Sequence, residues 1–356
     1  MDENVFSFFK RLADSPSPSG YEQPAQRVWR EYVAPHVDEV RTDVMGNTWG
    51  VLRGPERPRV MLAGHVDEIG LMVQYVDDQG FLYFAPIGGV DAHLLPGQRV
   101  RVHGRNGTVL GVIGRKPIHL LEQDERTKVV KLKDLAVDIG AKDRAEAEAH
   151  VAVGDPMTFA VEMERLGGND RVCARGLDDK MGSFVVAETL RRLSARRAKL
   201  QCSVFGVSTV QEEVGLRGGR TSAYGIDPDV GICVEVTFAT DHPGVDKKAI
   251  GDVQVGKGPV LSRGPNINPK VFELLQESAR EAGIALQYEA APRATGTDAN
   301  VMQLSRSGVA TALVEIPLRY MHTPAEVLSL ADVDAAADLL VAFLLKVGPG
   351  ADWIPQ

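Results

Sequence analysis

The hydrophobic pattern of the C-terminal half alternates between short apolar runs and helical stripes. Near the end of the chain, Val333, Ala337, Leu340 and Leu344 recur at the spacing of one helix face. Alternating strands and helices are typical of a mainly parallel sheet flanked by helices. We therefore expect an α/β fold, with strands near 202–210, 230–236, 285–288 and 310–316, and helices that begin near 178 and span 269–282.

The segment between positions 69 and 159 has a different pattern. Short β-rich runs are separated by the turn-forming residues Asp78-Gln79-Gly80 and Asn106-Gly107, and one helix is expected near 141–149. Such strand-and-turn repetition predicts a small antiparallel sheet or barrel. The predicted organisation is an α/β domain of residues 1–69 and 164–356, interrupted by an inserted β-rich domain of residues 70–163.

Composition and charge exclude several classes of protein. The 356 residues include 40 Lys and Arg against 48 Asp and Glu, a formal net charge of −8. This acidic excess argues against a nucleic-acid partner. With 44% hydrophobic residues the chain is too apolar for a disordered protein, and it has no apolar run of about 20 residues that predicts a membrane span. The N-terminus lacks a signal-peptide pattern, and three widely spaced cysteines favour a reducing cytoplasm without disulfides.

Candidate metal-binding chemistry begins at the end of the expected strand 59–65. Side chains alternate along a strand, so His65 and Asp67 share a face. An imidazole and a carboxylate at this spacing supply one metal ligand and one partner that orients the ring. The alternative interpretation is a hydrogen-bonded structural histidine beside an exposed acid. Taken alone, this motif favours the structural interpretation.

Two pairs of acids follow at places where strands end or helices begin. Asp178 and Asp179 open an expected helix, where one carboxylate can cap the helix and the other can bridge two cations. Glu212 and Glu213 directly follow the strand 202–210, at the edge where open α/β sheets place their sites. Adjacent carboxylates point in different directions, so one can ligate a metal while the other faces a water.

The last two candidates are an acid inside a strand and a histidine after one. Glu235 lies in an apolar strand, where a lone carboxylate is costly unless it is paired or bound to metal. His322 follows the strand 310–316. Nearly all of these residues lie at the carboxyl ends of strands in one domain, and this coincidence favours a hydrolytic site with two metal ions.

With these motifs in place, the chain resembles the M42 family of metallo-aminopeptidases, the group of glutamyl aminopeptidases and tetrahedral aminopeptidases. The resemblance runs nearly end to end. Its motifs, in order, are Pro18–Glu22, Gly64–Gly70, Gly111–Leu121, Asp134–Ala141, Leu177–Gly182, Gln211–Gly219, Thr240–Gly244, Gly256–Asn268, Gly296–Asn300 and Met321–Glu326.

The resemblance implies a site with two divalent ions per subunit, zinc in the first place, with cobalt or manganese as alternatives. It implies that His65, Asp178 and Glu235 hold one ion and that Asp178, Glu213 and His322 hold the other. Glu212 would be the general base beside a bridging hydroxide, and Asp67 would orient His65. The family usually has Asp at the position of Glu235, so this ligand departs from the pattern.

The implied activity is removal of N-terminal residues from short peptides. The inserted domain would serve dimerisation, and the dimers would assemble into dodecamers. Gly296, Thr297 and Asp298 are candidates for the substrate pocket, although Thr297 or Asp298 is equally suited to cap a helix. A carboxypeptidase or deacylase with the same ions, with Arg217 or Arg293 binding a substrate carboxylate, is one alternative. A metal-free binding or scaffold protein is the other.

Overall fold

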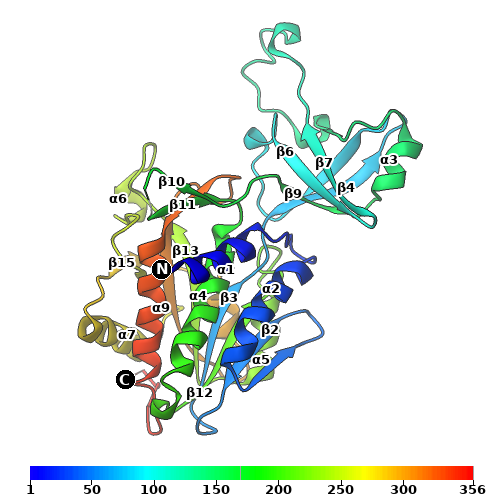
Figure 1. Cartoon of the computed structure of the whole chain (residues 1–356). Coiled ribbons are helices and arrows are strands. Elements are labelled where there is room, and N and C mark those ends of the chain that lie inside the picture. Colours follow the sequence, from blue (N-terminus) through cyan, green and yellow to red (C-terminus); the bar gives the residue numbers. More distant parts are fainter. Residues whose placement is uncertain (169, 356) are drawn as a thin grey trace.

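A mixed eight-stranded sheet forms the centre of the larger part of the protein (Figure 1). The computed structural model describes residues 1–168 and 170–355. The four central strands are parallel and buried, as their apolar sequences require. In spatial order the strands are β1 (Glu39–Thr42), β2 (Thr48–Leu52), β12 (Ser203–Thr209), β3 (Arg59–His65), β13 (Val230–Phe238), β16 (Ala310–Leu318), β14 (Val260–Arg263) and β15 (Gln287–Ala290).

Helices cover this sheet and bury its apolar side chains. Helix α4 packs against β3, β12 and β13, and it also contacts α1, α2 and α9. This position explains why α4 is buried along nearly its whole length. The helices around the sheet are α1 (Glu3–Asp14), α2 (Gln23–Val33), α4 (Leu177–Ser194), α5 (Arg217–Ile226), α6 (Lys247–Ile250), α7 (Pro269–Ala282), α8 (Ala299–Met302) and α9 (Leu330–Leu344), with 3₁₀ turns at Ala34–His36 and Arg197–Lys199.

Two glycines allow the start of α4 to approach the end of β3. A Cβ atom added at Gly64 would lie 2.4 Å from the carbonyl carbon of Gly182. A Cβ at Gly182 would lie 2.2 Å from a carboxylate oxygen of Asp179. Only glycine at these two positions lets strand and helix backbones come so close. The consequence is that the first turn of α4 lies beside His65.

A closed six-stranded barrel stands apart from the sheet (Figure 1). It has its own hydrophobic core, separate from the larger one. Its strands, in order around the barrel, are β4 (Gly70–Val76), β5 (Leu82–Ile87), β8 (Val137–Asp138), β7 (Gly107–Ile113), β6 (Arg99–Gly104) and β9 (Pro156–Phe159), accompanied by α3 (Arg144–His150) and 3₁₀ turns at Ala92–Leu94, Ile118–Leu120 and Leu132–Asp134. The predicted α/β fold with an inserted β-rich part is confirmed.

A small third sheet consists of β10 (Glu164–Leu166), β11 (Arg171–Ala174) and β17 (Glu326–Ser329). Some expected boundaries shift: the helix expected at 141–149 begins at Arg144, because the Asp143 side chain caps it, and the strand expected at 285–288 is Gln287–Ala290.

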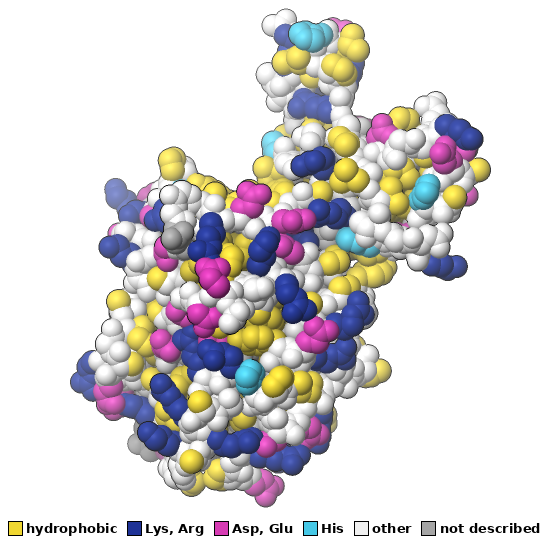
Figure 2. Space-filling model, in the orientation of Figure 1, with side chains coloured by type: hydrophobic (Ala, Val, Ile, Leu, Met, Phe, Trp, Pro, Cys, Tyr) yellow, Lys and Arg dark blue, Asp and Glu magenta, His cyan; other side chains and the backbone are white. Residues whose placement is uncertain are grey.

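Figure 2 shows basic and acidic side chains interspersed on one face, so the net charge is not gathered into a single acidic field there. Within the described ranges, no helix combines the length and apolar character needed to cross a membrane.

Candidate metal centre and active site

Five of the predicted site residues meet at one edge of the sheet. His65 ends β3, Glu212 and Glu213 follow β12, Glu235 lies near the end of β13, and His322 follows β16. These strands are parallel, so their carboxyl ends lie at the same edge. Residues far apart in the chain therefore converge because of the sheet topology.

The two aspartates at the start of α4 take different roles. Both have non-helical backbone angles. The Asp179 carboxylate accepts hydrogen bonds from the backbone N–H groups of Gly182, at 2.9 Å, and His65, at 3.1 Å. Asp179 thus caps the helix and ties it to β3, while the side chain of Asp178 faces the cavity.

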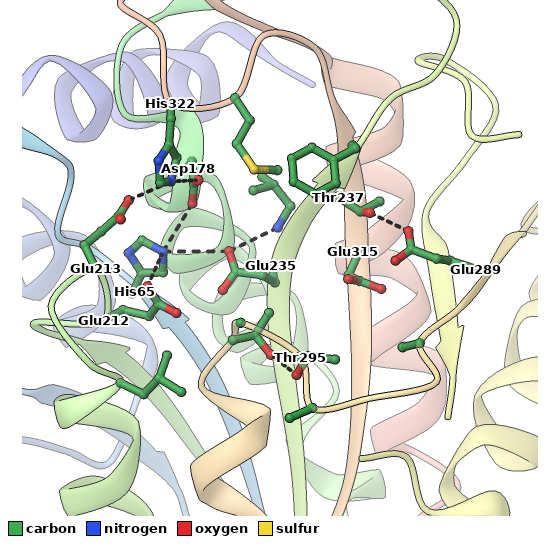
Figure 3. Close-up of a pocket in the computed structure, with 18 of the residues that line it drawn as sticks. His65, Asp178, Glu212, Glu213, Glu235, Thr237, Glu289, Thr295, Glu315 and His322 are labelled. Carbon is green, nitrogen blue, oxygen red and sulfur yellow. Dashed lines mark hydrogen bonds and ion pairs between the residues drawn. The ribbon is translucent and has the colours of Figure 1, made fainter. Parts of the chain in front are cut away.

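The Asp178 carboxylate lies between two imidazoles (Figure 3). Its Oδ1 is 3.3 Å from Nε2 of His65, and its Oδ2 is 3.3 Å from Nε2 of His322. Nε2 of His322 is also 3.4 Å from a Glu213 oxygen. Nε2 of His65 is 3.7 Å from a Glu235 oxygen and 3.8 Å from a Glu212 oxygen. The Asp178 carboxylate therefore belongs to two groups of potential metal ligands, one around each histidine.

Each histidine ring is oriented through its other nitrogen. Nδ1 of His65 lies 3.0 Å from the backbone oxygen of Asp67, and Nδ1 of His322 lies 2.9 Å from the backbone oxygen of Gly89, in the loop after β5. A ring that donates through Nδ1 presents Nε2 as the ligand atom. A Cβ atom at Gly89 would lie 2.9 Å from the His322 ring, so glycine is required at this contact.

Carboxylates behind the cluster hold its backbone in place. Asp67 accepts hydrogen bonds from the Ser19 hydroxyl at 2.7 Å and from the backbone N–H groups of Glu212 and Glu213 at 3.0 and 3.2 Å. Glu326 accepts from the backbone N–H groups of His322, at 2.9 Å, and Asp178, at 3.2 Å. Asp67 therefore also positions the two glutamates after β12.

Burial and crowded charge perturb the acids of this cluster. Burial, together with the charges of neighbouring carboxylates, raises the pKa of Glu212 to about 9 and that of Glu213 to about 7. Burial is the larger cause and the charge of Asp179 the next, and together they raise the pKa of Glu235 well above its ordinary value. The hydrogen bond to Asp178 raises the pKa of His322 to about 9. Burial lowers the pKa of His65, but the surrounding acids Glu235, Glu212, Asp178 and Asp67 together outweigh it and raise that pKa.

These residues fit divalent cations. The buried carboxylates repel one another, and cations between them would offset this repulsion. Imidazole nitrogens and carboxylate oxygens are ligands for zinc and for other first-row metals. Ligand atoms of His65, Asp178 and Glu213 all lie within 4.8 Å of one another, and so do those of His65, Asp179 and Glu235. Within the described part of the chain, Oε1 of Glu212 is buried without a hydrogen-bond partner.

A cavity of about 480 Å³ opens beside the cluster. Gly296 and Thr297, two of the predicted substrate-pocket residues, line it. The third, Asp298, lies behind them, buried, and accepts a hydrogen bond from the Thr209 hydroxyl at 2.6 Å. Asp298 also occupies the position before α8, without a side-chain capping bond. The role of these three residues in substrate binding stays a prediction.

Several residues at this site are absent from the sequence-based set. Glu315 and Glu289 line the same cavity, and Glu326 supports Asp178 and His322 from behind. Glu315 carried a signal in the sequence, because it is an acid inside an apolar strand, as Glu235 is. Glu326 acts through backbone N–H groups, and no side-chain pattern reveals such contacts.

Comparisons with known proteins agree with this geometry. The family model described as M42 glutamyl aminopeptidase matches residues 46–339. A lysyl aminopeptidase of Pyrococcus furiosus is 40% identical over 97% of this chain and 98% of its own length. A glutamyl aminopeptidase of Lactococcus lactis is 27% identical over 96% of both chains.

Among solved structures, a TET aminopeptidase from the archaeon Thaumarchaeota archaeon SCGC AB-539-E09 superimposes with a TM-score of 0.93. It is 35% identical and covers 98% of this chain and 97% of its own. The TET1 peptidase of Pyrococcus horikoshii, described as assembling into a tetrahedron or a large octahedral shell, matches with a TM-score of 0.86 at 30% identity, over 96% of this chain and all of its own.

Proposed function

The chain belongs to the M42 family of aminopeptidases, and we propose that it removes N-terminal residues from short peptides at a centre of two divalent cations. The observation that carries this proposal is the Asp178 carboxylate, whose two oxygens each face the Nε2 atom of a different histidine. One carboxylate shared between two donor groups is the arrangement expected of a two-metal site.

We assign His65, Asp178 and Glu235 to one cation and Asp178, Glu213 and His322 to the other. Zinc is the first candidate, and cobalt and manganese are the alternatives. When bound, such ions polarise the scissile carbonyl and lower the pKa of a water molecule. Three carboxylates against two divalent ions leave one positive charge, which suits an anionic nucleophile.

Glu212 is the proposed general base. Its carboxylate lies on the cavity wall beside Nε2 of His65, and its Oε1 atom accepts no hydrogen bond from the residues that the structure describes. In this role it takes a proton from the attacking water and delivers it to the leaving amine. Cations beside it would favour its ionised form. Asp67 orients His65 and holds the backbone N–H groups of Glu212 and Glu213.

The charge of the cavity favours an aminopeptidase over the carboxypeptidase and deacylase alternatives. Among the described residues that line it, Arg293 is the single Lys or Arg, against six acids. Arg217, the other candidate for a substrate carboxylate, bonds to the side chain of Gln211 at 3.1 Å, and it is absent from the described lining. The positively charged α-amine of a peptide substrate would be attracted to this acidic cavity wall. An aminoacyl-anilide should be cleaved faster than its N-acetylated analogue, and the reverse order would favour the alternatives.

The family membership and the sequence also support a proposal about assembly and location. We propose that residues 70–163 form a dimerisation domain, that residues 1–69 and 164–356 form the catalytic domain, and that dimers assemble into a dodecamer in the cytoplasm. The shells described for the TET1 relative support a homo-oligomer. Light scattering on the purified protein measures the number of copies, and a monomer at working concentration would contradict the assembly.

The decisive experiment compares two neighbouring glutamates. Glu212→Gln should keep about two metal ions per chain by elemental analysis and lose about 10²–10⁴-fold in kcat, because general-base catalysis contributes that much. Glu213→Gln should lose metal as well as turnover. A near-normal kcat in Glu212→Gln would refute the base assignment, and wild-type protein with well under one ion per chain would favour a metal-free scaffold.

A further inference from the structure

Two carboxylates outside the proposed ligand set line the same cavity. Glu315 of β16 pairs in register with Glu235 of β13, so both side chains point to one face of the sheet. Glu289 of β15 reaches the hydroxyl of Thr237, two residues beyond Glu235 on the same face. Figure 3 shows both carboxylates on the side of the cavity away from His322. The acidic wall thus continues past the metal cluster.

These two carboxylates are only partly satisfied by the protein. Glu315 is 4% exposed and accepts one hydrogen bond, from the Ser262 hydroxyl to its Oε2 atom. Glu289 accepts one bond, from Thr237 to its own Oε2 atom. Within the described chain, no Lys or Arg lies within 4.0 Å of either carboxylate. Burial and then the charge of Glu289 raise the pKa of Glu315 to about 8, so the two acids also repel each other.

The rest of the cavity wall suits a long side chain with a charged end. Met321 and Phe238 supply apolar surface beside the acids, against which a methylene stem can pack. Arg293 lines the same cavity but is exposed, and it forms no ion pair within the described chain. A cationic group between Glu315 and Glu289 would compensate both charges, whereas a neutral or anionic group would leave them unpaired.

We propose that Glu315 and Glu289 bind the cationic side chain of the substrate's N-terminal residue, so that this enzyme prefers peptides that begin with lysine or arginine. This inference rests on the proposed aminopeptidase function. In this arrangement, the residues that would hold the cations lie beside the scissile bond, the apolar wall contacts the methylene stem, and the two carboxylates accept hydrogen bonds from the ammonium or guanidinium group.

The test compares lysyl- and norleucyl-p-nitroanilide with metal-loaded wild-type protein. The two substrates share a four-carbon stem and differ in the terminal ammonium. We expect kcat/KM to be at least tenfold higher for the lysyl substrate. Glu315→Gln combined with Glu289→Gln should lower this ratio at least tenfold, mainly through KM for the lysyl substrate. L-lysine should inhibit the wild type more strongly than L-norleucine does, and the double variant should lose that difference.

Glu164→Gln is the matched control, because Glu164 is exposed on β10 and lies outside the cavity lining. It should leave the ratio unchanged. If the double variant does not fold, the single variant Glu289→Gln provides the same comparison, because Glu289 is only half-buried. A ratio near one in the wild type, an unchanged ratio in the variants, or fastest cleavage of a glutamyl-anilide would overturn the inference. Cleavage of none of the anilides would instead overturn the aminopeptidase proposal beneath it.

Discussion

A buried ion cluster behind the active site yields a quantitative stability prediction. The Glu68 carboxylate contacts both Arg175 and Lys180, and all three side chains are at most 3% exposed. The Lys180 ammonium lies 2.8 Å from Glu68 and also donates to the backbone oxygens of Ala13 and Ser15 at 3.0 and 2.7 Å. One anion thus compensates two buried cations and ties α4 to the end of α1.

Glu68→Gln keeps the shape of this side chain and removes its charge. Removing one partner of a buried ion pair costs about 3–5 kcal/mol, because the remaining charge has no compensation. With an unfolding entropy of about 2.1 cal/mol/K per residue, 356 residues give about 0.75 kcal/mol/K for unfolding in one step. The expected loss is therefore about 4–7 °C in Tm.

Differential scanning calorimetry on metal-loaded protein measures this shift. The control is Glu31→Gln, which breaks an ion pair with Arg11 whose two side chains are 64% and 58% exposed; exposed pairs contribute about 0–1 kcal/mol. Adding Lys180→Met to Glu68→Gln should recover part of the loss, because it removes one uncompensated cation. A Glu68→Gln Tm equal to that of Glu31→Gln, or no recovery in the double variant, would refute the reasoning.

Two further predictions concern pH and metal. Burial and then Asp67 raise the pKa of Glu22 from 4.5 to about 7, so the folded state binds this proton more tightly than the unfolded state and loses stability as the pH rises through this range. The free energy of unfolding of Glu22→Gln should therefore rise by about 2 kcal/mol relative to that of wild type as the pH goes from 5.5 to 8, measured by denaturant unfolding. A difference between the two proteins that stays constant with pH would contradict this. Dialysis against a chelator should lower Tm, with a loss of about 3 kcal/mol relative to protein at a hundredfold excess of metal over Kd, and zinc, cobalt or manganese should restore it; an unchanged Tm would contradict metal binding.

The sequence predicts the α/β fold and the convergence of acids because both depend on local patterns. Apolar runs such as 202–210 identify buried strands, and parallel strands bring their carboxyl ends to one edge. The order of the strands is not local. Nothing in the pattern of 59–65 indicates that this strand lies between β12 and β13, which is the arrangement that places His65 beside Asp178.

Residues that act through long-range or backbone contacts leave little trace in the sequence. Glu315 and Glu235 have the same sequence signal, an acid within an apolar strand, but the partnership of Glu315 with Glu289 depends on the sheet fold. Nothing in the sequence around Gly89 indicates that its carbonyl oxygen orients His322. Such contacts become visible only when distant segments are placed together.

Strands that are neighbours in the sheet lie far apart in the chain, and this affects how the protein folds during its synthesis. Every barrel strand lies between Gly70 and Phe159, so this part of the chain can close as soon as it leaves the ribosome. Strand β3 must instead wait for β12 and β13, and the Asp178 carboxylate meets its second histidine only once His322 has been synthesised. A chain that ends before His322 therefore lacks the complete cluster, so the site cannot assemble until translation has passed this residue.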